Sequence, residues 1–203
     1  RTINESLLQG LEKIASDKDI QVIWQTGKFY IENIKKSVAE MGVNTGNLYI
    51  SDFIPNMDLA YSIADLVVSR AGASSISELS LLKKASILVP SPNVSEDHQR
   101  KNAMALVEKD AAIMITDDKS REELVDTMLA LVKNEEQLNS LRNNITSFAC
   151  PSAAEQIAIE VFKTIGITDP AILSNRKSTK PEPKKAKKKQ SNKRYFFLGI
   201  GGI

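Results

Sequence analysis

The feature that most constrains the fold is a series of short, continuously apolar segments, each followed by a segment with helical periodicity. Strands that are apolar at every position are typical of a parallel sheet covered by helices on both faces. We expect such strands at residues 20–25, 48–50, 65–69, 86–90 and 111–115. The pattern therefore predicts an α/β fold with a doubly wound parallel sheet.

Helical periodicity fills the stretches between these strands, with apolar residues recurring every three to four positions. We expect helices at residues 2–16, 30–41, 57–64, 74–82, 98–109, 120–132, 135–145 and 153–165. The first helix has no strand before it, which is an unusual start for an α/β domain.

Composition excludes several classes of protein. With 203 residues, 42% of them apolar, the chain is long enough to bury a substantial core. The single cysteine, Cys150, rules out an internal disulfide framework and is typical of a reducing compartment. Because the only histidine is His98, we expect no metal site. A catalytic Cys150–His98 pair is possible by number alone, but a buried structural cysteine fits the sequence context better.

Charge divides the chain into an acidic body and a basic tail. Ten of the 27 basic residues, but only one of the 25 acidic residues, lie between Arg176 and Arg194. The remainder has 17 basic and 24 acidic residues, a formal charge of −7, which argues against nucleic acid as a partner of the body. No apolar run is long enough to span a membrane and residues 1–5 do not resemble a signal peptide, so we expect a cytoplasmic protein.

Three parts follow from the change in composition along the chain. Residues 1–166 carry the α/β pattern, and residues 167–193 form a Lys- and Pro-rich segment that we expect to be a disordered basic linker. The linker is either a plain spacer or a segment that touches anionic lipid. Residues 194–203, Arg-Tyr-Phe-Phe-Leu-Gly-Ile-Gly-Gly-Ile, read as the first strand and glycine-rich loop of a truncated second domain. The alternative is a frayed apolar terminus.

The candidate site lies where the 65–69 strand turns into a helix. Parallel sheets bind ligands beyond the carboxyl ends of their strands. The turn Arg70–Ala73 points backbone N–H groups and the positive end of the helix dipole at one spot, where anions bind. Glu78, about one and a half turns further on, is placed to accept hydrogen bonds from ligand hydroxyls. This pattern suits a nucleotide; the alternative is that Gly72 makes a tight turn and Glu78 is a solvated helix residue.

Four blocks at this sheet edge resemble the C-terminal, donor-binding domain of MurG-type glycosyltransferases. The blocks lie at Trp24–Lys28, Asp52–Met57, Ser69–Leu79 and Pro90–Ala103. The resemblance covers residues 1 to about 165 and implies the Rossmann-like half of a GT-B fold. It further implies transfer of N-acetylglucosamine from UDP-N-acetylglucosamine to lipid-linked muramoyl-pentapeptide in peptidoglycan biosynthesis. The expected location is the inner face of the plasma membrane, with no cofactor and no obligatory metal.

The resemblance also implies roles for particular residues. The main chain of Ile54 would read the uracil and Glu78 would bind the ribose hydroxyls. The amides at the helix start would face the phosphates and sugar, and Gln99 and Asn102 would bind the sugar hydroxyls. His98 stands where some relatives have a second glutamine, so its contact is in doubt. The residues assigned to the substrate are Ile54, Arg70, Gly72, Ala73, Ser74, Ser75, Glu78, His98, Gln99 and Asn102.

The resemblance implies that an acceptor-binding N-terminal domain, outside this chain, supplies the groups nearest the chemistry. It also implies that a glycine-rich loop and strand before the first helix help to hold the diphosphate. We therefore expect an inverting hexosyltransferase when intact and an inactive protein when isolated. Residues 194–203 resemble the start of UDP-N-acetylmuramate–alanine ligase, which would bring ATP and Mg²⁺ only if that domain follows. The alternatives are a non-catalytic UDP-sugar-binding module, another GT-B enzyme, or a UDP-N-acetylglucosamine 2-epimerase. An epimerase would need additional acidic and histidine side chains around the sugar, and this chain has only one histidine.

Overall fold

The computed structural model describes residues 1–93, 97–166 and 193–198. The chain divides into two compact units, Arg1–Ala149 with Lys188–Ile203, and Cys150–Lys187. The sequence suggested a first domain of residues 1–166, whereas the first segment of this unit ends at Ala149. The expected linker, residues 167–193, lies outside the described residues except for Lys193.

The described elements closely follow the predicted ones. In chain order they are α1 (Thr2–Gln9), α2 (Leu11–Ser16), β1 (Ile20–Gln25), α3 (Ile31–Met41), β2 (Leu48–Ser51), α4 (Met57–Ile63), β3 (Leu66–Ser69), α5 (Ala73–Leu81), β4 (Ala85–Leu88), α6 (His98–Val107), β5 (Ile113–Met114), α7 (Ser120–Lys133), α8 (Glu135–Asn144), the short 3-10 helix η2 (Ile145–Phe148), α9 (Ala153–Thr164) and β6 (Arg194–Leu198).

The sheet is parallel throughout, with strand order β2-β1-β6-β3-β4-β5. This confirms the predicted doubly wound α/β fold. The order matches the doubly wound order 3-2-1-4-5-6, except that the last strand of this chain holds the place of the first. In the register, Phe196 of β6 lies opposite Val22 of β1 on one side and Leu66 of β3 on the other.

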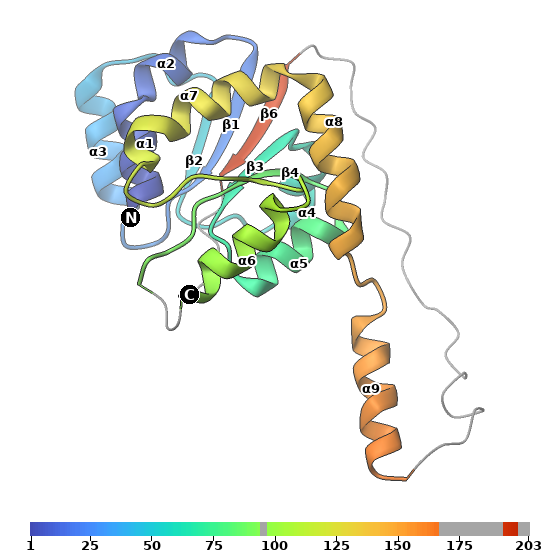
Figure 1. The fold of residues 1–203 in the computed structure, drawn as a ribbon. Coiled ribbons are helices and arrows are strands. Elements are labelled where there is room, and N and C mark those ends of the chain that lie inside the picture. The colour runs from blue at the N-terminus through green and yellow to red at the C-terminus, as the bar shows by residue number, and fades with distance from the viewer. Residues whose placement is uncertain (94–96, 167–192, 199–203) are drawn as a thin grey trace. The chain divides into compact units, whose positions relative to one another are not determined.

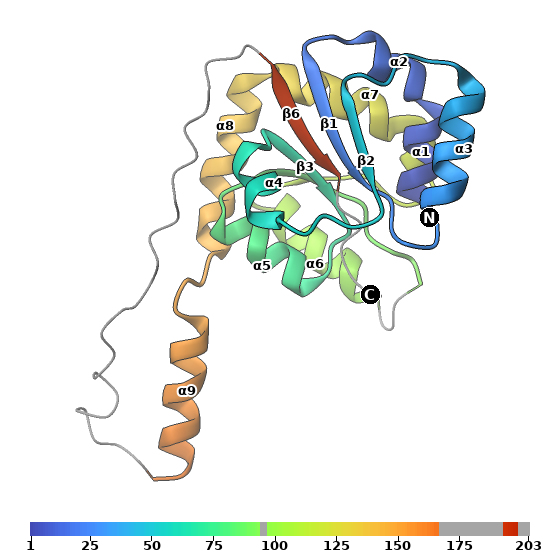
Figure 2. The ribbon, with the colours of Figure 1, turned by 180° about the vertical axis from the view of Figure 1, so that it is seen from behind.

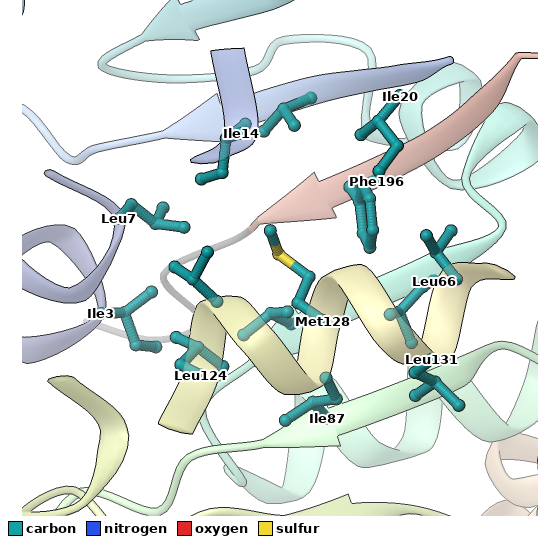
Figure 3. Close-up of a cluster of buried hydrophobic side chains, with 14 of the residues drawn as sticks. Ile3, Leu7, Ile14, Ile20, Leu66, Ile87, Leu124, Met128, Leu131 and Phe196 are labelled. Atoms are coloured by element: carbon teal, nitrogen blue, oxygen red, sulfur yellow. The ribbon is translucent and has the colours of Figure 1, made fainter. Parts of the chain in front are cut away.

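Helices cover both faces of the sheet (Figures 1 and 2). Helices α1, α2, α3, α7 and α8 contribute to a core cluster on one face, and α4, α5 and α6 to a cluster on the other. Figure 3 shows the first cluster, in which Phe196 lies close to Met128 of α7 and to Leu66. Alternate residues of the central strands supply the two clusters: Val68 enters the first and Val67 the second.

Strand β6 is buried on both faces. Phe196, with 0% of its surface exposed, belongs to the first core cluster, and Phe197, with 1% exposed, belongs to the second. The amino end of the strand is held by polar contacts, because Tyr195 N–H donates to Asp65 Oδ2 (3.0 Å) and Arg194 forms an ion pair with Glu135 (2.6 Å). Asp65 N–H in turn donates to the carbonyl of Tyr195 (2.7 Å).

The placement of β6 differs from the sequence-based expectation. We expected residues 194–203 to open a second domain, whereas Arg194–Leu198 belongs to the sheet of the first unit. The physical reason is that β1 and β3 each need a hydrogen-bonded neighbour, and an apolar strand with two aromatic residues fits the space between them. Residues 199–203, with the expected glycine-rich loop, lie outside the described residues.

Two further details depart from expectation. The first predicted helix is two helices that meet at Gly10, where an added Cβ would lie 2.6 Å from Val125 Cγ2 of α7. A glycine is needed here because the branched Val125 side chain leaves no space for a larger residue.

In the second unit, Cys150 is exposed, not buried, with its Sγ 3.5 Å from Gln156 Oε1. Helix α9 buries none of its residues.

We predict that Phe196→Ala lowers the free energy of unfolding by about 3–5 kcal/mol, because it leaves a cavity between α7 and the sheet. Chemical denaturation of the full chain measures this. The matched control is Phe29→Ala, the same change at a side chain that is 93% exposed, which should cost less than about 0.5 kcal/mol. Equal effects of the two variants would show that β6 is not part of the folded sheet in solution.

Candidate functional site

The candidate site lies along the carboxyl edge of the sheet. Because all strands are parallel, the loops that follow β1, β2, β3, β4 and β5 emerge at this one edge. The order of strands reverses between β6 and β3, and ligands of open α/β sheets bind at such a switch point. The turn that follows β3 carries the predicted anion site.

The turn after β3 leads directly into α5. Gly72 precedes the helix in an extended conformation (φ −67°, ψ 149°), and the backbone N–H groups of Ala73, Ser74 and Ser75 form the first turn, which has no acceptor within the helix. Ala73 and Ser74 are exposed, whereas Ser75 is buried. These amides and the helix dipole make a partial positive charge that faces outward from the sheet edge.

Gly72 is not required by the backbone or by neighbouring side chains. Its φ is one that any residue adopts, and an added Cβ would meet only Ser75 Oγ, at 3.9 Å. The alternative in which Gly72 only makes a tight turn therefore gains no support from this backbone. What the missing side chain does provide is open space in front of the first amides of α5.

Glu78 lies on the exposed side of α5 and is held by Tyr61 of α4, whose hydroxyl donates to Glu78 Oε2 (3.2 Å). Burial, together with the neighbouring Glu78 carboxylate, raises the pKa of Tyr61, so the hydroxyl keeps its proton and remains a donor. The ring of Tyr61 packs edge-on against Phe197, with the ring centroids 5.2 Å apart. A strand of the core therefore supports the orientation of an exposed carboxylate.

Gln99 and Asn102 of α6 both contact the turn after β3. Gln99 Oε1 accepts hydrogen bonds from the N–H groups of Ala71 (3.3 Å) and Ser91 (2.9 Å), and Asn102 Nδ2 donates to the carbonyl of Ala71 (3.2 Å). Neither Gln99 Nε2 nor Asn102 Oδ1 has a hydrogen-bond partner among the described residues, so a donor and an acceptor remain for a ligand. His98, the first residue of α6, is exposed.

The Arg70 side chain binds other parts of the protein. Its guanidinium is largely buried, and Nη1 donates to the carbonyls of Val89 (3.1 Å) and Pro90 (3.3 Å) and pairs with Asp117. The resemblance assigned Arg70 to the substrate, whereas in this structure it joins the ends of β3 and β4. Its contact with a ligand stays a prediction.

Ile54 is buried, and its N–H donates to Gln25 Oε1 (3.2 Å) at the end of β1. The resemblance implies that the Ile54 main chain binds uracil, whereas in this structure the Ile54 N–H donates to the side-chain carbonyl of Gln25. Gln25 lay inside one of the recognised blocks but had no role assigned to it.

Sequence reasoning missed three partners of the site: Gln25, Tyr61 and Asp117. The sequence signal for Asp117 is weak, because it lies three residues after the partly buried β5, whereas Arg70 follows the buried β3 directly. Within the described residues, no group of three or more His, Cys, Asp or Glu side chains is arranged to hold a metal ion. None of the described helices has the length and apolar character needed to cross a membrane.

The parallel sheet with helices on both faces defines a doubly wound α/β domain, and its helix start beside the switch point is a candidate anion site. Comparison of the sequence with models of protein families shows which family of α/β proteins this chain belongs to. Residues 1–157 match the model of the glycosyltransferase family 28 C-terminal domain. The chain belongs to this family.

Several curated relatives carry the name UDP-N-acetylglucosamine--N-acetylmuramyl-(pentapeptide) pyrophosphoryl-undecaprenol N-acetylglucosamine transferase. The protein from Bacteroides fragilis is 50% identical over 163 residues, which are 80% of this chain and 43% of the relative. The protein from Cytophaga hutchinsonii is 51% identical over 165 residues, 81% of this chain and 43% of the relative. This chain thus spans less than half the length of these relatives.

The fold is also found in a solved structure. A crystal structure of Acinetobacter baumannii MurG superposes with a TM-score of 0.68 at 25% sequence identity, over 80% of this chain and 46% of that one. The described parallel sheet therefore corresponds to one half of a two-domain glycosyltransferase.

We predict that Gly72→Ala weakens binding of UDP-N-acetylglucosamine about tenfold, ~1.4 kcal/mol, because a methyl group enters the space in front of the α5 amides. Since that space is open in the folded chain, the midpoint of thermal unfolding should move by less than about 2 °C. Titration calorimetry and a thermal melt on the same sample measure both quantities. A loss of affinity that merely tracks a loss of stability would contradict the prediction.

Proposed function

We propose that this chain is the donor-binding half of an N-acetylglucosaminyltransferase of peptidoglycan biosynthesis. The observation that carries the proposal is the meeting of a free helix start, an oriented carboxylate and two side-chain amides at one sheet edge, in a chain about 50% identical to transferases of that name. Because the chain spans less than half of those relatives, the reaction of the whole protein remains part of the proposal.

The proposed donor follows the order of groups along the edge. Uracil lies against the main chain of Ile54, where it replaces Gln25 Oε1 as the acceptor of the Ile54 N–H, and the ribose hydroxyls bind Glu78 in the orientation set by Tyr61. The diphosphate faces the first amides of α5, and the sugar hydroxyls meet Gln99 Nε2 and Asn102 Oδ1, which have no partner among the described residues.

The chemical role of this half is to stabilise the leaving group. In an inverting transfer, an acceptor hydroxyl attacks the anomeric carbon while the bond to UDP breaks and negative charge develops on the diphosphate. Oriented amides and a helix dipole stabilise such charge without rearranging. We propose that they do this without a divalent cation, and that the group that accepts the proton of the hydroxyl lies in the other half of the protein.

The acceptor named in the relatives is an undecaprenol-linked pyrophosphate, which is a lipid. We therefore propose that the intact protein works at the inner face of the plasma membrane, with the cationic segment of residues 176–194 near anionic headgroups. Each lysine near such a surface contributes about 1 kcal/mol. We propose no nucleic-acid partner.

Our prediction for the chain as it stands is saturable binding of UDP-N-acetylglucosamine, in the presence of EDTA, without transfer of the sugar. Titration calorimetry measures the binding, and addition of lipid-linked acceptor with radiolabelled donor measures the transfer. Guanosine diphosphate mannose serves as the control donor and should not bind. Absence of binding would refute the donor-site proposal, and measurable transfer would show that the other half is not needed.

We predict that Glu78→Ala weakens UDP binding by more than about 1 kcal/mol, because charge-assisted hydrogen bonds to the ribose are lost. Tyr61→Phe removes only the hydrogen bond that orients Glu78, so its effect should be smaller and in the same direction. The control is Glu108→Ala, an exposed carboxylate just after the carboxyl end of α6. Unchanged affinity in Glu78→Ala would remove the ribose role.

A non-catalytic UDP-sugar-binding module is the second candidate, since every group assigned here binds the donor and none activates an acceptor. The two candidates differ in one measurement, the activity of the chain when joined to an acceptor-binding domain. An epimerase would instead release a rearranged sugar from the donor alone, which incubation without acceptor detects.

A further inference from the structure

Asp117 joins several segments at the sheet edge, although sequence reasoning gave it no role. It follows β5, and its two carboxylate oxygens have different partners: Oδ1 pairs with the Arg70 guanidinium, and Oδ2 accepts from Thr2 Oγ1 (2.8 Å) at the start of α1. Its own backbone is held by the buried Ser120, whose hydroxyl donates to the Asp117 carbonyl (2.8 Å). The carboxylate therefore links the first helix, β3 and β5.

Arg70 extends this connection to β4. Its Nη1 donates to the carbonyls of Val89 and Pro90 as well as to Asp117. The side chains of Arg70 and Asp117 are only 11% and 18% exposed. Since the removal of one member of a largely buried pair leaves a charge without a partner, Arg70 would have to move if the carboxylate were lost.

The segments that Arg70 and Asp117 hold are the ones that position Gln99. Ala71 follows Arg70 directly, and Ser91 follows Pro90; the N–H groups of Ala71 and Ser91 both donate to Gln99 Oε1. Asn102 donates to the carbonyl of Ala71. A shift of the turn after β3 relative to the end of β4 would therefore move both side-chain amides.

The base side of the site has separate supports. Ile54 N–H is held by Gln25 of β1, and Glu78 is held by Tyr61, which packs on Phe197 of β6. None of these contacts passes through Arg70 or Asp117.

We propose that Asp117 is a positioning residue for the sugar side of the donor site. Acting through Arg70, it sets where Gln99 and Asn102 stand relative to the first turn of α5, and it touches no ligand atom itself. This inference rests on the proposed donor-binding function.

The test is the affinity of Asp117→Asn for UDP-N-acetylglucosamine and for UDP, measured by calorimetry on the full chain. The nucleotide-sugar should lose at least tenfold in affinity, whereas UDP should lose less than threefold, so the ratio of the two dissociation constants changes. The matched control is Asp118→Asn, which removes the exposed neighbouring carboxylate and should alter neither value. An unchanged ratio in Asp117→Asn, whether both affinities stay or both fall equally, overturns the proposal.

Two further measurements test whether Asp117 acts on Gln99 through Arg70. Arg70→Met combined with Asp117→Asn should bind the nucleotide-sugar no more weakly than Arg70→Met alone, because Asp117 acts through Arg70; additive losses overturn the proposal. In ligand-free ¹H–¹⁵N spectra, the amide signals of Ala71 and Ser91 should shift in Asp117→Asn and not in Asp118→Asn. That result is independent of the donor: failure of the wild type to bind UDP-N-acetylglucosamine refutes the proposed function, whereas unmoved signals refute the link from Asp117 to Gln99.

Discussion

The domain depends on the burial of β6 between β1 and β3. A central parallel strand must pair its backbone on both edges and cover both faces with apolar side chains. Phe196 and Phe197 meet the second requirement on opposite faces, so the strand joins two core clusters that are otherwise separated by the sheet. Strand β6 also supports the candidate site, because Tyr61 packs on Phe197 and orients Glu78.

The sheet edge is held mainly by polar side chains that bind the backbone of neighbouring loops. Gln25, Gln99 and Asn102 each pair with a main-chain group of another segment. Such contacts fix loops before a ligand arrives, which reduces the ordering cost of binding. Two of these residues are also the ones that the family resemblance assigns to the sugar, so holding the loop and recognising the donor use different atoms of the same side chain.

Most of the local structure could be predicted because periodicity and turn residues report it directly. The strand at Ile20–Gln25 has the predicted bounds, and the helix predicted at 74–82 begins one residue earlier. The break at Gly10 was not predicted, and the need for a glycine there could not be, because Val125 lies on a distant helix. In the site, the start of α5 and the place of Glu78 on that helix were predicted from spacing, and their contact with a ligand stays a prediction. The pairing of Arg70 with Asp117, 47 positions away, was not, because no local pattern encodes a contact of that range.

The sequence by itself determined the α/β class, the parallel sheet and the family, and it predicted the edge that carries the site, since each depends on residues close together in the chain or on motifs in order. Only the tertiary structure decided that Arg194–Leu198 completes this sheet and that Arg70 joins loops at its edge. The physical reason is the same in both cases. An apolar strand fits any open place between two strands, and a charged side chain pairs with whichever opposite charge the fold brings near, so the choice is made by packing and not by local sequence.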